Sequence, residues 1–211
     1  MKSYIGILGS CATGKSTRLN MFIEHLDEVA KIPYQVHDYT FMKNDVPVTI
    51  TNAGRAYANG IYIVGNKTKA GNWVGADYTF GKLGDKLSIY AFMEEAMSIH
   101  DTFIVEGYFA VGGGFLRPAQ LREYGLFDAC SQYYFLYDTL DQYIERTEGR
   151  TVKTWEQRGK DPEKSAGWKS NKTFLSGMKK AIAGTTSLDS ITKVDYDTRK
   201  TYFVDEFKGL I

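Results

Sequence analysis

A glycine-bounded loop near the N-terminus has the residue types and spacing to bind phosphates. Residues 9–17, called the glycine loop below, follow the pattern G-x-x-x-x-G-K-[ST] and are Gly9, Ser10, Cys11, Ala12, Thr13, Gly14, Lys15, Ser16 and Thr17. In such a loop the backbone N–H groups and a following helix dipole attract an anion. Gly14 leaves room for a phosphate, Lys15 reaches the β- and γ-phosphates, and Ser16 can bind Mg²⁺, with Thr17 as a secondary contact. A chance match to a glycine-rich turn is the alternative.

A carboxylate stands where a metal or a reacting hydroxyl would need one. Glu106 follows the apolar residues Thr102–Val105, so it lies at the carboxyl end of an expected strand, where open α/β sheets bind ligands. There it can orient Mg²⁺ through water or accept a proton from an attacking hydroxyl. The alternative is a strand-end charge that bonds a neighbouring loop amide.

A glycine-rich region contains a second group of candidates. Residues 73–78 combine Trp73, Asp77 and Tyr78 with flexible glycine backbone. Stacking on Trp73 or Tyr78, with a hydrogen bond to Asp77, suits recognition of a base or its hydroxymethyl group. Asp77 is also a candidate general base, and Asp38, at the end of an expected strand 34–38, is its rival. The alternative is a hairpin turn whose aromatic rings cover the core.

Basic residues gather in the C-terminal third. Arg146 and Arg150 are four apart and share a helix face, from which they could neutralise charge on a transferring phosphoryl group. Residues 146–180, the basic segment, contain 10 basic and 4 acidic side chains, among them Lys169 and Lys172. Basic residues interleaved with tryptophans suit a polynucleotide track. A solvated helical face is the alternative for both groups.

Strands and helices alternate along most of the chain, which predicts one three-layer α/β domain over 1–211. Residues 45–84 interrupt this alternation with an expected β-hairpin, formed by residues 46–50 and 61–64, and an acceptor-binding region. Residues 146–184 form an expected lid and basic helical segment. The expected strands are 4–8, 34–38, 46–50, 61–64, 102–105, 132–137 and 190–194. The expected helices are 16–29, 85–100, 139–148, pieces of 151–184, and one from about 198.

Composition excludes several classes of protein. With 211 residues, 43% hydrophobic and 24% charged, the chain is too apolar for a disordered tail. We expect no membrane span, because no apolar run is long enough, and no signal peptide, because the apolar stretch at the start is too short. Two cysteines and three scattered histidines argue against a zinc site and fit a reducing, cytoplasmic compartment. The net charge of +1 hides an acidic middle and the basic segment, so it does not exclude DNA as a partner.

The glycine loop, Glu106-Gly107 and Arg146…Arg150 together resemble the P-loop nucleoside and nucleotide kinases. More narrowly, Tyr62–Asn66, Trp73–Asp77 and Glu106-Gly107 resemble the phage 5-hydroxymethyluracil DNA kinases. The resemblance implies a P-loop NTPase fold with a mainly parallel five-stranded sheet, ATP and Mg²⁺ as cofactors, a phage origin in a host cytoplasm, and phosphorylation of a hydroxymethylated base in DNA.

Two other functions remain open at this point. The first is a kinase of a free nucleoside or deoxynucleoside monophosphate, which needs the same phosphate site. The second is a nucleotide-operated switch, which needs a water-positioning group and loops that sense the γ-phosphate; the sequence identifies neither.

Overall fold

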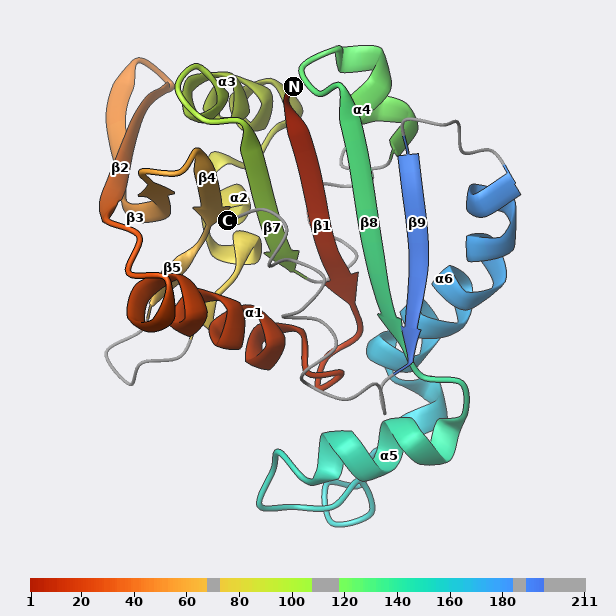
Figure 1. Ribbon diagram of the computed structural model, residues 1–211. Coiled ribbons are helices and arrows are strands. Elements are labelled where there is room, and N and C mark those ends of the chain that lie inside the picture. The colour runs from red at the N-terminus through yellow and green to blue at the C-terminus, as the bar shows by residue number, and fades with distance from the viewer. Residues whose placement is uncertain (68–72, 108–117, 184–188, 196–211) are drawn as a thin grey trace.

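The computed structural model describes residues 1–67, 73–107, 118–183 and 189–195 as an α/β structure with helices on both faces of one large sheet (Figure 1). The strands are β1 Ser3–Gly9, β2 Tyr34–Lys43, β3 Val46–Tyr57, β4 Ile61–Val64, β5 Asn66–Lys67, β6 Trp73–Val74, β7 Thr102–Gly107, β8 Ala129–Leu136 and β9 Asp189–Asp195. The helices are α1 Lys15–Glu24, continued by a π-helical turn His25–Val29, then α2 Ala76–Leu83, α3 Lys86–Met97, α4 Pro118–Tyr124, α5 Leu140–Glu148, a 3₁₀ turn Pro162–Lys164, and α6 Ala166–Ala183.

The large sheet is mostly parallel and has seven strands in the order β2-β3-β4-β7-β1-β8-β9. Strand β1 lies near the centre and pairs in parallel with β7 and β8, while β4 and β9 extend the parallel part outward. At the β4 edge, β3 and β2 continue the sheet in antiparallel fashion. The sheet has five parallel strands, as predicted, but β4 is one of them although residues 61–64 were expected in a hairpin, and residues 34–38 lie instead in the antiparallel edge strand β2.

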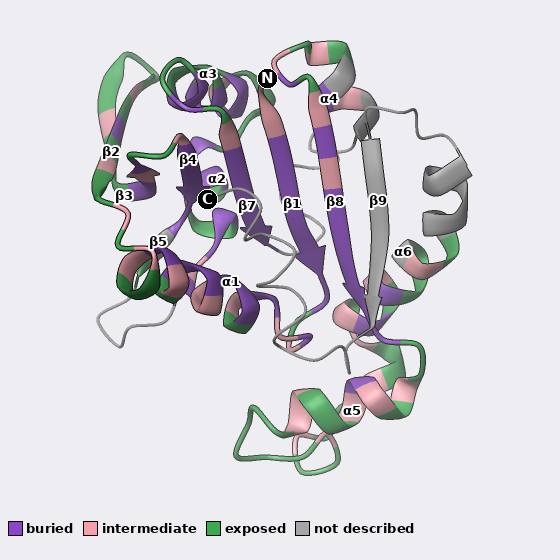
Figure 2. Ribbon diagram, viewed as in Figure 1, coloured by how far each residue is buried: buried purple, intermediate pink, exposed green. Residues whose placement is uncertain are grey.

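Each face of the sheet has its own apolar core. Leu19, Phe22 and Ile23 of α1 pack with Ile5 and Ile7 of β1 on one face. On the other face, α2 and α3 bury a second cluster that includes Phe80, Phe92 and Phe103. The central strands are buried almost throughout (Figure 2), as expected for parallel strands covered on both sides.

Strand pairing in residues 34–64 differs from the prediction. The stretch 46–50 pairs with residues 39–43 through a tight turn at Asn44 and Asp45, both at positive φ, and 61–64 pairs instead with residues 54–56. Strand β4 is then the edge strand of the parallel part. Asp38 consequently lies in the middle of β2, beside a bulge, and does not end a strand. Within the region 45–84, β3 and β4 belong to the main sheet, whereas β5 and β6 form a separate two-stranded antiparallel sheet.

Two helices are well marked in the sequence, and one is not. Asp85 caps α3 by accepting from Ser88 N, and Thr139 with Gln142 forms a capping box at α5, so both begin where local signals place them. Helix α2 was not predicted, because glycines flank it and it has only eight residues. The helix expected from about 198 lies outside the described residues. Within the described residues, no helix has the length and apolar character needed to cross a bilayer.

Parallel pairing places the carboxyl ends of β4, β7, β1 and β8 along one edge of the sheet. The glycine loop follows β1 there, Glu106 lies at the end of β7, and Tyr137 follows β8. The sheet therefore brings together residues separated by more than a hundred positions.

Candidate functional site

The glycine loop is held against the end of β8 and opens into α1. Ser10 N donates to the carbonyl of Phe135 at 3.1 Å, and the Thr13 hydroxyl donates to Ser10 O at 2.9 Å. Gly14 is the N-cap of α1 and adopts φ 85°, a conformation that favours glycine. Because Gly14 has no side chain to cap the helix, the first N–H groups of α1 remain available to an anion.

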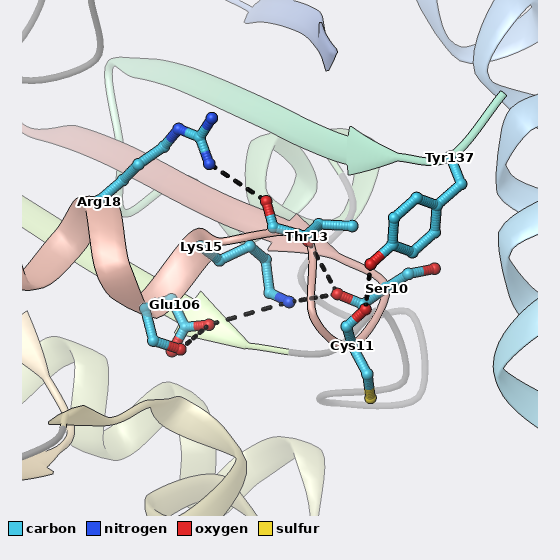
Figure 3. A network of polar contacts seen from close by, with 8 residues as sticks. Ser10, Cys11, Thr13, Lys15, Arg18, Glu106 and Tyr137 are labelled. Atoms are coloured by element: carbon cyan, nitrogen blue, oxygen red, sulfur yellow. Dashed lines mark hydrogen bonds and ion pairs between the residues drawn. The ribbon is translucent and has the colours of Figure 1, made fainter. Parts of the chain in front are cut away.

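Lys15 and Glu106 lie close together beside the loop (Figure 3), and Ser16 forms a compact polar group with them. The Lys15 ammonium donates to Ser10 O at 2.7 Å and lies 4.0 Å from Glu106 Oε1. The Ser16 hydroxyl donates to the same Glu106 oxygen at 3.2 Å. A hydroxyl and a carboxylate side by side are oxygen ligands of the type that Mg²⁺ prefers.

Gly75 brings a second carboxylate to this group. A Cβ atom on Gly75 would collide with Glu106 O and Glu106 Oε2, so only glycine allows this approach of the chain to β7. Helix α2 begins at the next residue and bears Asp77 in its first turn. Asp77 is close enough to raise the pKa of both Lys15 and Glu106, after the larger effects of burial and of the Lys15–Glu106 pairing.

Burial dominates the electrostatics of the pair. It lowers the pKa of Lys15 from its usual value, and the neighbouring carboxylate of Glu106 offsets part of that shift. Burial raises the pKa of Glu106 above its usual value, although the Lys15 ammonium opposes this. The Lys15 ammonium and the Glu106 carboxylate therefore both lower the stability of the folded chain. Such shifted pKa values are common at functional sites.

This raised pKa has a measurable consequence for stability. A carboxyl group whose pKa is raised on folding stabilises the protein below its unfolded pKa, near 4.5, and that contribution is lost as the pH rises through the folded value. We expect Glu106→Gln to raise the melting temperature at pH 7, and the gain to shrink towards pH 4. Removing the carboxylate also lowers the pKa of Lys15 further, which makes the buried ammonium more costly and reduces the gain. Thermal melts of both proteins at several pH values measure this.

Glu24→Gln, on an exposed position of α1, is the control for loss of a carboxylate. A gain from Glu106→Gln that is the same at pH 4 and pH 7 would contradict the raised pKa.

The two predicted arginines lie at the end of α5, close enough to the site to affect its electrostatics. The positive charge of Arg150 acts to lower the pKa of Lys15, Glu106 and Tyr137. Arg146 acts in the same way on the pKa of Arg18 and Tyr137. Both are exposed, Arg146 in the last turn of α5 and Arg150 just beyond it. The structure thus brings Lys15, Ser16, Asp77, Glu106 and both arginines to one end of the sheet.

Other predicted residues lie elsewhere. The Trp73 ring is 4% exposed, donates to Val64 O and packs in the core, so a stacking role would require it to leave that core. Tyr78 is 37% exposed and keeps an accessible ring. Asp38 is exposed and accepts from Asn52 N at 2.7 Å. Its strand is four places from β1, which is roughly 19 Å at the usual strand spacing. Asp77 is therefore the better placed of the two rival bases.

Three residues around the loop were not predicted from the sequence. Arg18 is 4% exposed and donates to Thr13 O at 3.1 Å, and the Tyr137 hydroxyl donates to Cys11 O at 2.8 Å (Figure 3). Asn171, fully buried in α6, accepts from the Ser10 hydroxyl at 2.9 Å. One signal was available for Asn171: it is a polar residue at helical spacing between Trp168 and Leu175, where an apolar residue is expected.

Comparison with protein families gives a match to 5-hmdU DNA kinase 2 over residues 1–207. The chain belongs to this family. The match covers nearly the whole chain, so it includes the glycine loop, Glu106 and the basic segment, and it confirms the resemblance drawn from the sequence. The family name makes the protein a kinase, that is, a phosphotransferase. Comparisons with curated proteins and with solved structures gave no match.

Proposed function

We propose that this protein is an ATP-dependent kinase with a P-loop fold that phosphorylates the hydroxymethyl group of 5-hydroxymethyluracil in DNA. The observation that carries the proposal is the arrangement of Lys15, Ser16, Asp77 and Glu106 at the carboxyl edge of the sheet, in a chain that matches a DNA kinase family over residues 1–207. The setting is the cytoplasm of a phage-infected host.

The residues of the site divide into groups that hold the phosphates and groups that act on the acceptor. The loop N–H groups and Lys15 bind the β- and γ-phosphates. Ser16, with Glu106 behind it, would hold Mg²⁺, which supplies charge neutralisation on the phosphate oxygens. Arg146 and Arg150 stabilise the negative charge on the transferring group from the α5 side.

Transfer forms a bond from the acceptor hydroxyl oxygen to the γ-phosphorus and breaks the bond from that phosphorus to the β,γ-bridging oxygen, which leaves on ADP. The hydroxyl proton passes to Asp77, which lies in the first turn of α2, two residues after the Gly75 backbone that contacts Glu106. Catalysis consists mainly of positioning and charge stabilisation, as is general for phosphoryl transfer.

The acceptor is tested with ATP labelled in the γ-phosphate. The wild-type protein is incubated with duplex DNA containing 5-hydroxymethyluracil, with the same duplex containing thymine, or with free hydroxymethylated and ordinary deoxynucleotides. We expect label in acid-insoluble DNA from the hydroxymethylated duplex alone. Label only in small molecules would identify a kinase of free nucleotides, and release of phosphate regardless of acceptor would identify a switch-like NTPase.

The basic segment provides the DNA contact. Lys169 and Lys172 are exposed on α6, and Lys172 lies 3.9 Å from Glu163 and 6.0 Å from the Trp168 ring centre. We expect the double variant Lys169→Glu, Lys172→Glu to weaken DNA binding by about 10-fold or more and to reduce the salt dependence by up to about two phosphate contacts, with ATP affinity unchanged. Fluorescence anisotropy with labelled duplex at several salt concentrations measures both quantities.

A matched control reverses the same charge elsewhere. Lys31→Glu, Lys43→Glu places the changes before β2 and at its end, at the opposite edge of the sheet from α6. Equal loss of DNA affinity in both double variants would mean that overall charge, not the basic segment, binds DNA.

A further inference from the structure

Helix α6 contains both a buried amide and exposed basic residues. Asn171 is 0% exposed and Trp168 6% exposed, whereas Lys169 and Lys172 are exposed. The helix that carries these two lysines therefore also contacts the glycine loop, through Asn171. Figure 1 shows α6 beside the carboxyl ends of β8 and β9.

The Asn171 amide makes three hydrogen bonds that fix its orientation. Its Oδ1 accepts from the Ser10 hydroxyl and from Tyr137 N, both at 2.9 Å, and its Nδ2 donates to Tyr137 O at 2.7 Å. Because Tyr137 N can only donate and Tyr137 O can only accept, the amide oxygen and nitrogen are assigned without ambiguity. Removing this buried amide would leave several polar groups without partners, which is costly.

The partners of Asn171 are the residues that shape the glycine loop. Ser10 accepts the Lys15 ammonium and the Thr13 hydroxyl on its carbonyl oxygen, and Tyr137 donates its hydroxyl to Cys11 O. A displacement of Asn171 would therefore reach Lys15 through Ser10 and the middle of the loop through Tyr137. Both routes consist of direct hydrogen bonds of 2.7–2.9 Å.

We propose that Asn171 is a positioning residue that couples DNA binding on α6 to ATP binding in the glycine loop. The inference rests on the proposed function, since it takes DNA to bind Lys169 and Lys172. DNA bound to α6 also keeps Asn171 hydrogen-bonded to Ser10. The glycine loop is then already ordered when ATP binds, so ATP binding loses less conformational entropy. The coupling is positive and reciprocal: each ligand tightens the other by the same factor.

Nucleotide binding tests the contact between α6 and the loop. Affinity for a fluorescent ATP analogue is measured for Asn171→Ala, Ser10→Ala and the double variant. We expect each single variant to weaken binding roughly 10-fold, as for loss of a buried hydrogen bond, and the double variant to be no weaker than Asn171→Ala. Thr173→Ala, on the exposed side of α6, is the control and keeps wild-type affinity. Unchanged affinity in both single variants, or effects that multiply in the double variant, would overturn the role of this bond.

The same titrations with and without hydroxymethylated duplex test the coupling. We expect saturating DNA to tighten ATP binding about 5-fold or more in the wild type, and this factor to approach 1 in Asn171→Ala while DNA affinity without ATP is unchanged. A purely structural role would lower both affinities and leave the factor intact, which overturns the proposal, as does a wild-type factor of 1.

Failure of the proposed function gives a different pattern. If the wild-type protein binds ATP but not DNA, the proposal that DNA is the acceptor is wrong, and so is the coupling. The ATP affinities of the Ser10 and Asn171 variants still show whether the Ser10–Asn171 hydrogen bond shapes the glycine loop. If Asn171→Ala fails to fold, Ser10→Ala removes the same hydrogen bond from the loop side and decides both the ATP affinity and the coupling factor.

Discussion

Lys15→Ala abolishes phosphoryl transfer while the protein stays folded. Lys15 is the cation closest to the loop carbonyls, with its ammonium 2.7 Å from Ser10 O and 4.0 Å from Glu106. No other residue of the glycine loop has a positive charge to offer the γ-phosphate. Loss of one charged group that stabilises a transition state typically costs about 10²- to 10³-fold in rate, and we expect at least that here.

The fold should survive this substitution because burial already disfavours the Lys15 ammonium, as its lowered pKa shows. Circular dichroism and thermal melts measure folding, and transfer of label from ATP to hydroxymethylated DNA measures activity. Lys43→Ala, at an exposed position at the end of β2, is the matched control and keeps wild-type activity. A folded Lys15→Ala protein with normal transfer would reject the assignment of the glycine loop as the phosphate site.

Gly75→Ala has the second large expected effect. Its Cβ would meet the backbone carbonyl and Oε2 of Glu106, so the start of α2 or the end of β7 must shift. We expect a loss of stability of about 1–3 kcal/mol, as for overpacking in a core. The rate of transfer falls roughly 100-fold, because a displacement of about 1 Å separates Asp77 and Glu106 from their working positions.

The same helix supplies the matched control. Gly81 lies within α2, and a Cβ there meets nothing within 4 Å. Gly81→Ala should therefore stabilise the protein by about 0.5–1 kcal/mol through helix propensity and leave transfer unchanged. Denaturant unfolding and the transfer assay measure both variants. Equal behaviour of the two substitutions would mean that the contact of Gly75 with Glu106 does not set the geometry of the site.

Local patterns were sufficient for part of the site. The glycine loop was predicted because strand, turn and helix each have short-range signals in the sequence, and the apolar run that ends at Glu106 placed a carboxylate at a strand end. The helix expected over 139–148 corresponds to α5, and it placed Arg146 in the last turn. These features depend on residues a few positions apart.

Other parts depended on contacts between distant residues. Whether residues 46–50 pair with 39–43 or with 61–64 is a choice between competing strand partners, and the apolar alternation fits both. The burial of Trp73 follows from packing against α1 and β4, which its own neighbours in sequence do not reveal. The strand expected over 34–38 continues to Lys43, because it pairs with β3, and Asp38 therefore does not end a strand.

The amino-acid sequence specifies the chemistry of this protein, because a phosphate loop and a strand-end carboxylate are encoded within short segments. The tertiary structure alone decides which groups lie near one another: Gly75 at the start of α2 contacts Glu106, Asp38 is bonded to Asn52 at the far edge of the sheet, and Asn171 reaches Ser10 from 161 residues away. The physical reason is that hydrogen bonds and close packing act over a few ångströms, and only the folded sheet brings these residues within that range.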